Sequence, residues 1–228
     1  ISDNYEDKTV LNSSRELFTI LGVLIALVVP YIYKVSQNPS LTLDTLFITF
    51  LVLFIPLFLI SLKKINIKLT ASSEKFSFDN IKTVYTKLPK IKYLQIGYFL
   101  NNLANALPAT LFLLFTEHII NEKDSSGLIL ILYFFSGVIA LLFWNMLANK
   151  IGKKNTWIIS IVLACSAFVF VPFLQSGDLY AFIVISLISG LSLGADMALP
   201  TAIQSDLVQE SKKLNTNISG LLFGIWTM

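Results

Sequence analysis

The sequence predicts an all-α, polytopic membrane protein, and three observations support this fold class. First, 55% of its 228 residues are hydrophobic and only 14% are charged, with a mean hydropathy of +0.73, whereas about 25% of residues in a soluble domain are charged. Second, long uncharged stretches alternate with short lysine-rich ones. Third, six of the apolar stretches reach the ~17–25 residues that a membrane-spanning helix needs.

The predicted spans are seven apolar segments, the last of which is incomplete. The six full ones cover residues 16–33, 41–62, 93–116, 127–147, 157–174 and 179–203. The seventh, 218–228, stops after eleven residues in mid-pattern, and the chain begins with Ile1 in place of an initiator methionine. We therefore expect an internal piece of a longer protein, with about six spanning helices and the start of a seventh.

Basic residues predict how the spans are oriented. If the connections alternate sides, one side carries fifteen of the seventeen lysine and arginine residues, and the other side carries only Lys34 and Lys123. Short basic connections are retained in the cytoplasm. The connections 1–15, 63–92, 148–156 and 204–217 are therefore predicted to be cytoplasmic, in a bacterial-type inner (plasma) membrane. The net charge of +3 reflects this topology, and no nucleic-acid partner is expected.

The longest polar segment, 63–92, marks the predicted boundary between two halves. Residues 1–62 would end an N-terminal bundle, and 93–228 would belong to a C-terminal one. Aromatic and aliphatic residues such as Phe76 and Tyr85 are mixed with lysines in this segment. It could lie as an amphipathic helix on the inner membrane surface, or it could be a solvated linker.

Three asparagines interrupt the third span and form the first candidate site. Asn101, Asn102 and Asn105 have i,i+3 and i,i+4 spacing, which places them on one side of a helix. Counted from Tyr93 at ~1.5 Å per residue, they lie near the middle of a ~30 Å hydrocarbon core, and Pro108 loosens the helix just beyond them. The amides could bind a solute in a polar cavity, or they could only hydrogen-bond neighbouring helices.

Asp196 is the second candidate, because a carboxylate inside a span tends to be functional. Counted from Leu179, it is expected nearer the inner surface than the middle, and it could instead be a structural partner for a lysine or a helix end. Gly190 and Gly194 permit close helix approach. Arg15 could reach the membrane surface or point inward as a fork of hydrogen-bond donors. Candidate gating residues at the inner side are Lys153, Lys154, Asp206 and Glu210, although simple solvation also explains them.

Several chemistries have no support in the sequence. It contains no H-E-x-x-H, G-x-S-x-G, C-x-x-C or Walker-type motif. His118, expected at the outer end of the third span, is the only histidine, and Cys165 is the only cysteine, so a metal site or a Ser-His or Cys-His nucleophile has little to build on. We predict that the protein is not an enzyme and has no resident cofactor.

Four blocks, in order along nearly the whole chain, resemble the glycoside–pentoside–hexuronide:cation symporters, the melibiose-permease-like branch of the major facilitator superfamily. They are DNYEDKTVLNSSRELFTILG, YFLNNLANALPATLFLLF, WNMLANKIGKKNTW, and GADMALPTAIQSDLV followed by SGLLFGIW. The resemblance implies a major-facilitator helical bundle, with helices 5 to 10 and the start of helix 11 present here. Residues 63–92 would be the central cytoplasmic loop.

The resemblance also implies roles for single residues. Arg15 matches an arginine that contributes to the sugar site, Asn101 and Asn105 match cavity-facing positions, and Asp206 matches the first aspartate of an inner-loop D-x-x-D pattern. Gln209 replaces the second aspartate of that pattern, Lys8 replaces an arginine, and residues 217–219 depart from the usual arginine-and-glutamate stretch. These departures weaken any inner-gate salt bridge. The family's cation-site acids would lie outside this chain.

The expected function is secondary active transport of a sugar or glycoside, coupled to Na⁺ or H⁺, by alternating access. The alternative cargoes are a lipid, a drug or an organic acid, carried by facilitation or export, and a non-transporting membrane scaffold is a third possibility. The expected partners are a sugar-like solute and membrane lipids, with the protein acting as a monomer. The solute, the coupled ion and the direction of transport do not follow from the sequence.

Overall fold

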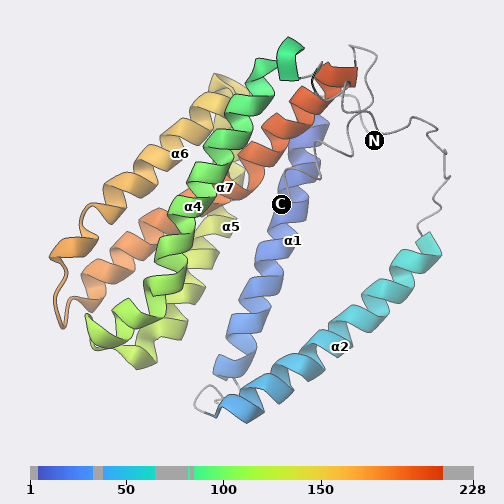
Figure 1. Ribbon diagram of the computed structural model, residues 1–228. Coiled ribbons are helices and arrows are strands. Elements are labelled where there is room, and N and C mark those ends of the chain that lie inside the picture. Colours follow the sequence, from blue (N-terminus) through green and yellow to red (C-terminus); the bar gives the residue numbers. More distant parts are fainter. Residues whose placement is uncertain (1–4, 33–37, 65–81, 83–84, 213–228) are drawn as a thin grey trace. The chain divides into compact units, whose positions relative to one another are not determined.

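A computed structural model describes residues 5–32, 38–64, 82 and 85–212, and these residues form helices without strands (Figure 1). The long helices are α1 (Tyr5–Ile32), α2 (Pro39–Lys64), α4 (Pro89–His118), α5 (Ser126–Ile151), α6 (Lys153–Phe168) and α7 (Leu179–Lys212). Two short 3₁₀ turns, η1 (Lys123–Ser125) and η2 (Val171–Phe173), precede α5 and follow α6. The all-α fold class is confirmed.

Five helical stretches are long and apolar enough to cross a membrane: Ser40–Lys64, Pro89–His118, Lys123–Ile151, Lys153–Phe173 and Leu179–Ser211. They correspond to the second through sixth predicted spans. The first predicted span lies in α1, whose apolar part among the described side chains is Leu17–Val29. The seventh predicted span, 218–228, lies outside the described residues.

The contacts divide the chain into two units, one of residues 22–75 and one of residues 1–21 and 76–228. In the first unit, α2 is apolar on all sides and its spanning stretch has no buried residue. Phe50, Phe54 and Phe58 stack along it with ring centroids 5.1 and 5.6 Å apart. A helix that is hydrophobic all round is typical of a membrane span. The predicted division at 63–92 stays a prediction, because 65–81 are outside the described residues.

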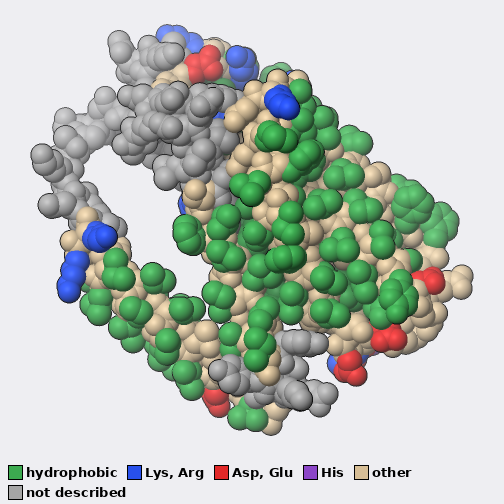
Figure 2. All heavy atoms as spheres, turned by 180° about the vertical axis from the view of Figure 1, so that it is seen from behind, with side chains coloured by type: hydrophobic (Ala, Val, Ile, Leu, Met, Phe, Trp, Pro, Cys, Tyr) green, Lys and Arg blue, Asp and Glu red, His purple; other side chains and the backbone are tan. Residues whose placement is uncertain are grey.

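In the second unit, α5 and α6 both pack along α7 (Figure 1). A buried apolar cluster drawn from α4, α5, α6 and α7 contains Trp144, Trp157 and Leu199, together with Ile91 and Leu94 of α4. Hydrophobic side chains also cover most of the visible outer face, with charged side chains gathered towards the helix ends (Figure 2). That distribution is expected where lipid, rather than water, surrounds the helices.

The predicted inner connections are more helical than expected. Residues 5–15 belong to α1, and α7 continues through the predicted connection 204–217 as far as Lys212. The predicted connection 148–156 shortens to Gly152, whose φ of 86° is easily adopted only by glycine. At the end of 63–92, α4 begins at Pro89, since proline is favoured at the first helical position. Charged residues therefore continue these helices beyond the apolar spans.

The predicted fifth span, 157–174, has a different end from the one expected. Helix α6 stops at Phe168, and residues Val171–Phe173 form the 3₁₀ turn η2. Pro172 explains this ending, because a proline ring clashes with the carbonyl of the residue four positions earlier, which is Phe168.

Candidate functional site in the α4–α7 bundle

The carboxylate of Asp196 accepts three hydrogen bonds from two other helices. Asn101 and Asn105 of α4 donate from Nδ2 to Asp196 Oδ2 at 3.0 and 2.9 Å. Trp157 of α6 donates from Nε1 to Asp196 Oδ1 at 2.7 Å. We call these four residues the Asp196 cluster. It joins three helices through one charged side chain, and bonds to a charged group are stronger than those between neutral groups.

The spacing of the donors explains why they meet at a single oxygen. Asn101 and Asn105 are one helical turn apart on the same face of α4, so both amides reach one partner on α7. Trp157 lies in the second turn of α6 and is buried, which fixes its indole N–H. Asp196 is partly exposed and Asn105 is exposed. The cluster is thus rigid on the Trp157 side and open on the asparagine side.

The hydrogen bonds place Asp196 at the same level as the two asparagines of α4 and as Trp157 in the second turn of α6. The expectation that Asp196 lies nearer the inner surface takes Leu179 as the membrane surface, and it stays a prediction. Helix α7 has 34 residues and is therefore ~50 Å long, which exceeds the ~30 Å hydrocarbon core. Its ends do not mark the membrane surfaces, and Asp196 lies near the middle of the helix.

Close packing of α5 against α7 holds the carboxylate in place. The main chains approach so closely at Gly190 and Gly194 that a Cβ on Gly194 would lie 2.5 Å from the Gly137 carbonyl oxygen. Trp144 Nε1 donates to the Leu191 carbonyl at 2.7 Å, and Ser136 Oγ lies 3.1 Å from the Leu187 carbonyl that accepts its hydrogen bond. The glycine pair predicted to permit helix approach therefore does so, one turn before Asp196.

Comparison with known proteins supplies the family. The family model for MFS/sugar transport proteins matches residues 1–228, the whole chain. The chain belongs to this family. No curated protein and no solved structure matched it.

Membership makes the protein a major facilitator transporter and an integral, multi-pass membrane protein. The predicted superfamily is thereby confirmed, whereas the melibiose-permease-like branch stays a prediction. The Asp196 cluster lies near the middle of α4 and α7, and transporters are expected to bind their cargo near the middle of spanning helices.

Two prolines close to the Asp196 cluster interrupt the main-chain hydrogen bonds of their helices. Pro108 lies inside α4 and Pro200 lies inside α7. Because proline has no N–H, the carbonyls of Ala104 and Asp196, four residues earlier, lose their usual helical donor. Main-chain acceptors are therefore released in the same turns that carry the cluster.

A second polar contact joins the same end of α6 to α7, one turn before Trp157. Lys153 Nζ and Asp206 Oδ2 are 2.7 Å apart, and the lysine side chain is only 3% exposed against 29% for the aspartate. Lys153 opens α6 directly after Gly152, where the helix dipole disfavours a positive charge. The carboxylate of Asp206 offsets both that dipole and the burial of the ammonium group.

Lys153→Met should therefore destabilise the protein. Removing one partner of a buried pair costs about 3–5 kcal/mol, and we expect about 1–3 kcal/mol here because water partly solvates Asp206. The double variant Lys153→Met/Asp206→Leu should recover part of that loss. Thermal unfolding in detergent measures both. Lys123→Met is the matched control, since the Lys123–Glu117 pair is also 2.7 Å long but exposed, and an equal loss there would contradict the assignment.

Four predicted site residues are not brought to the cluster. Asn102 is exposed and takes no part in the bonds to Asp196, and Arg15 is exposed on α1. Lys154 and Glu210 are exposed, and neither forms a salt bridge to another described residue. Their predicted roles in solute binding and gating stay predictions.

The structure adds Trp157 to the site and shows that Ser192 is buried one helical turn before Asp196. Sequence reasoning missed both. Trp157 begins an apolar segment, where a tryptophan is usually taken for a membrane-interface anchor. The position of Ser192, four residues before Asp196, was available as a signal in the sequence, because this spacing predicts a shared helix face.

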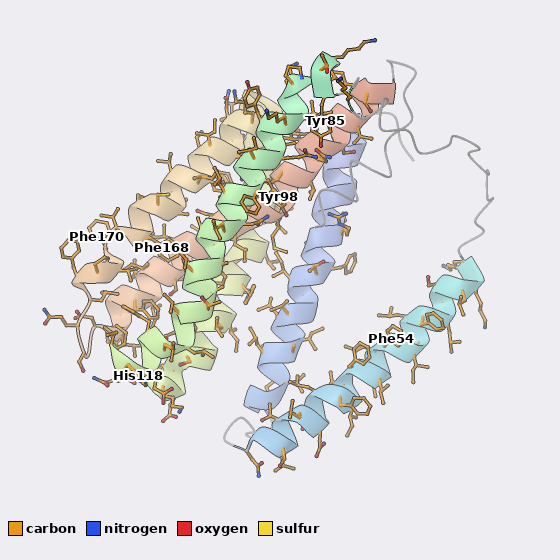
Figure 3. All side chains as sticks on the ribbon, viewed as in Figure 1. Phe54, Tyr85, Tyr98, His118, Phe168 and Phe170 are labelled. Carbon is orange, nitrogen blue, oxygen red and sulfur yellow. The ribbon has the colours of Figure 1, made fainter. Side chains whose placement is uncertain are left out.

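Polar contacts also lie at both ends of α4. At its carboxyl end, next to His118 (Figure 3), Glu117 pairs with Lys123. At its beginning, Tyr85 donates to Gln95 Oε1 at 2.6 Å (Figure 3).

Proposed function

We propose that this major facilitator protein carries a sugar or glycoside together with a cation, Na⁺ or H⁺, and that the Asp196 cluster binds the solute's hydroxyl groups. The observation that supports this proposal is the convergence of three hydrogen-bond donors on one carboxylate near the middle of α4 and α7. A carboxylate there is costly and is usually retained for a function.

The chemistry of the cluster suits neighbouring hydroxyls. A hydroxyl both donates and accepts, an ionised carboxylate only accepts, and an amide side chain does both. Each asparagine uses one N–H on Asp196, which leaves its Oδ1 and its second N–H for a ligand. Neighbouring hydroxyls can therefore accept from the second N–H of each asparagine and donate to its Oδ1. Trp157 meanwhile keeps the carboxylate in position from the buried side.

The charge of the cluster argues against an organic acid as cargo. Among the described residues, no lysine or arginine nitrogen lies within 4 Å of the Asp196 carboxylate. An anionic solute would meet an uncompensated negative charge, which is repulsive at low dielectric. A lipid or an apolar drug would leave the amides and the carboxylate without partners, which costs ~1–3 kcal/mol for each buried polar group.

We also propose that the lysine-rich connections face the cytoplasm of a bacterial-type cell. The described helix ends at Lys63 and Lys64, at Lys150 and Lys153, and at Lys212 all belong to the predicted inner side. Reporter fusions or cysteine labelling at these ends would test the orientation.

Replacing Asn101 and Asn105 with leucine tests the cargo. The experiment uses the full-length protein in proteoliposomes, with a panel of radiolabelled monosaccharides, α- and β-glycosides and hexuronates under an imposed Na⁺ or H⁺ gradient. One class should accumulate only with a gradient. In each single variant its uptake should fall about 10- to 100-fold, because a hydrogen bond to a charged group contributes about 1.5–3 kcal/mol.

Asn155→Leu is the matched control, since Asn155 of α6 is exposed and donates to the Ile151 carbonyl at the end of α5, away from the Asp196 cluster. It should transport normally. Uptake of no sugar in the panel, or full uptake by the Asn101→Leu/Asn105→Leu double variant, would refute the proposed cargo. Accumulation that is insensitive to both gradients would refute the symport.

A further inference from the structure

The negative charge of Asp196 has no positive partner in the described part of the chain, although three groups hydrogen-bond it. All three donors are neutral, namely two amides and an indole. We propose that Asp196 and Ser192 bind a Na⁺ ion, with oxygens released by the neighbouring asparagines and prolines completing the site.

The electrostatic part of this inference follows from where the carboxylate lies. Neutral donors stabilise an ionised carboxylate but leave its full charge in a membrane-spanning region, where an unpaired ion is expensive. A bound cation removes that cost. Because the cluster carries one negative charge, a monovalent ion neutralises it without leaving an excess of positive charge.

Asp196 also retains an oxygen lone pair for a metal ion. An ionised carboxylate has about four acceptor positions, and the three hydrogen bonds occupy three of them. The two asparagine Oδ1 atoms beside it are not used in those bonds, because both amides donate through Nδ2. Oxygen ligands of this kind suit a hard cation.

Ser192 provides an independent indication of a missing ligand. It lies one helical turn before Asp196 on the same face of α7. The residue is 2% exposed, and its Oγ has no hydrogen-bond partner in the structure. A buried hydroxyl without a partner is rare, and an unseen ion or water is one of its recognised explanations. A cation between this hydroxyl and the carboxylate would satisfy both groups.

The two prolines supply further oxygens at this level. Pro108 releases the Ala104 carbonyl in the turn of α4 that carries Asn101 and Asn105, and Pro200 releases the carbonyl of Asp196 itself. Interrupted helices whose free carbonyls bind alkali ions are a recurrent device in secondary transporters. The described residues contain no cluster of His, Cys, Asp and Glu able to hold a divalent or transition metal.

The role of this ion in coupling rests on the proposed symport, but its binding can be measured without any solute. The purified full-length protein would be titrated with NaCl against choline chloride at fixed pH and ionic strength. Tryptophan fluorescence and binding of radioactive Na⁺ would be recorded. Wild type should bind Na⁺ saturably. Asp196→Asn should weaken binding at least 10-fold, and Ser192→Ala about 3- to 10-fold.

Two matched variants control for the substitutions themselves. Asp178→Asn alters an exposed aspartate that accepts from the Gln175 main-chain N–H, and Ser166→Ala alters an exposed serine of α6. Both should bind Na⁺ like wild type. Ser192→Ala removes one oxygen from a small side chain, so its thermal unfolding in choline chloride should stay unchanged and the test does not depend on Asp196→Asn folding.

Absence of saturable Na⁺ binding in wild type would overturn the proposal, and so would unchanged affinity in both Asp196→Asn and Ser192→Ala. Proton uptake at Asp196 without any Na⁺ response would replace the metal ion by a proton and would also overturn it. If Na⁺ binds as expected while no sugar in the panel is transported, the cation site stands and the proposed cargo fails. If sugar is taken up while no Na⁺ binds, the cargo stands and the cation site fails.

Discussion

Asp196→Asn should reduce uptake of the transported solute about 100-fold or more. The substitution keeps the size of the side chain but removes its charge, and charge-assisted hydrogen bonds are roughly twice as strong as neutral ones. It also turns one acceptor oxygen into a donor that faces the Asn101 and Asn105 amides or the Trp157 indole. Losing two bonds of about 1.5 kcal/mol each corresponds to the expected factor. Uptake in proteoliposomes at matched protein content measures it.

Trp157→Phe separates solute contact from support of the carboxylate. It deletes one buried N–H donor on the side away from the asparagines, so uptake should fall by about 10-fold and not be lost.

A contrary result for Asp196→Asn would be uptake at the wild-type rate, together with normal membrane insertion. That result would show that the cluster is only a structural contact between helices.

Gly190→Ala should cause the largest loss of stability among single small substitutions. The added methyl group would overlap Ser136 Oγ and the main-chain carbonyl oxygen of Tyr133. A backbone oxygen cannot move aside, so α5 and α7 would have to separate. Overpacking of this kind costs typically 1–3 kcal/mol, occasionally more, and it would also pull Trp144 from the Leu191 carbonyl. Thermal unfolding in detergent measures the loss.

Gly127→Ala is the matched control, because a Cβ at Gly127 in α5 meets no described atom within 4 Å. Alanine is a better helix former than glycine by up to ~1 kcal/mol, so this variant should be as stable as wild type or more stable. If Gly190→Ala unfolds at the same temperature as Gly127→Ala, the close approach of α5 and α7 is not present in the protein.

Much of the fold could be predicted because a membrane imposes a length. An apolar run of about twenty residues identifies a span without knowledge of its neighbours, and the second to sixth spans follow from this rule. The ends were less predictable, since charged residues such as Lys150 and Lys212 continue their helices beyond the apolar region. Pro172 is a local signal for the early end of α6, but hydropathy alone does not reveal it.

The candidate site could be predicted only in part, because its residues lie far apart in the sequence. Asn101 and Asn105 share a helix face, which spacing reveals, and Asp196 is conspicuous as a carboxylate in a span. That these three meet depends on how α4 packs against α7, which no local pattern encodes. Trp157 contributes through its indole N–H, and a tryptophan at the start of a span gives no sign of that.

Helix α4 is tied to its neighbours differently from α6. A single glycine joins α5 to α6, and Lys153 fastens that hairpin to α7. The polar attachment of α4 to α7 in the described part of the chain includes two amide bonds to Asp196. An incoming hydroxyl can replace those bonds one for one. Arrival of cargo would thus release the polar contact of α4 with Asp196, while the apolar packing of Ile91 and Leu94 against the other helices remains.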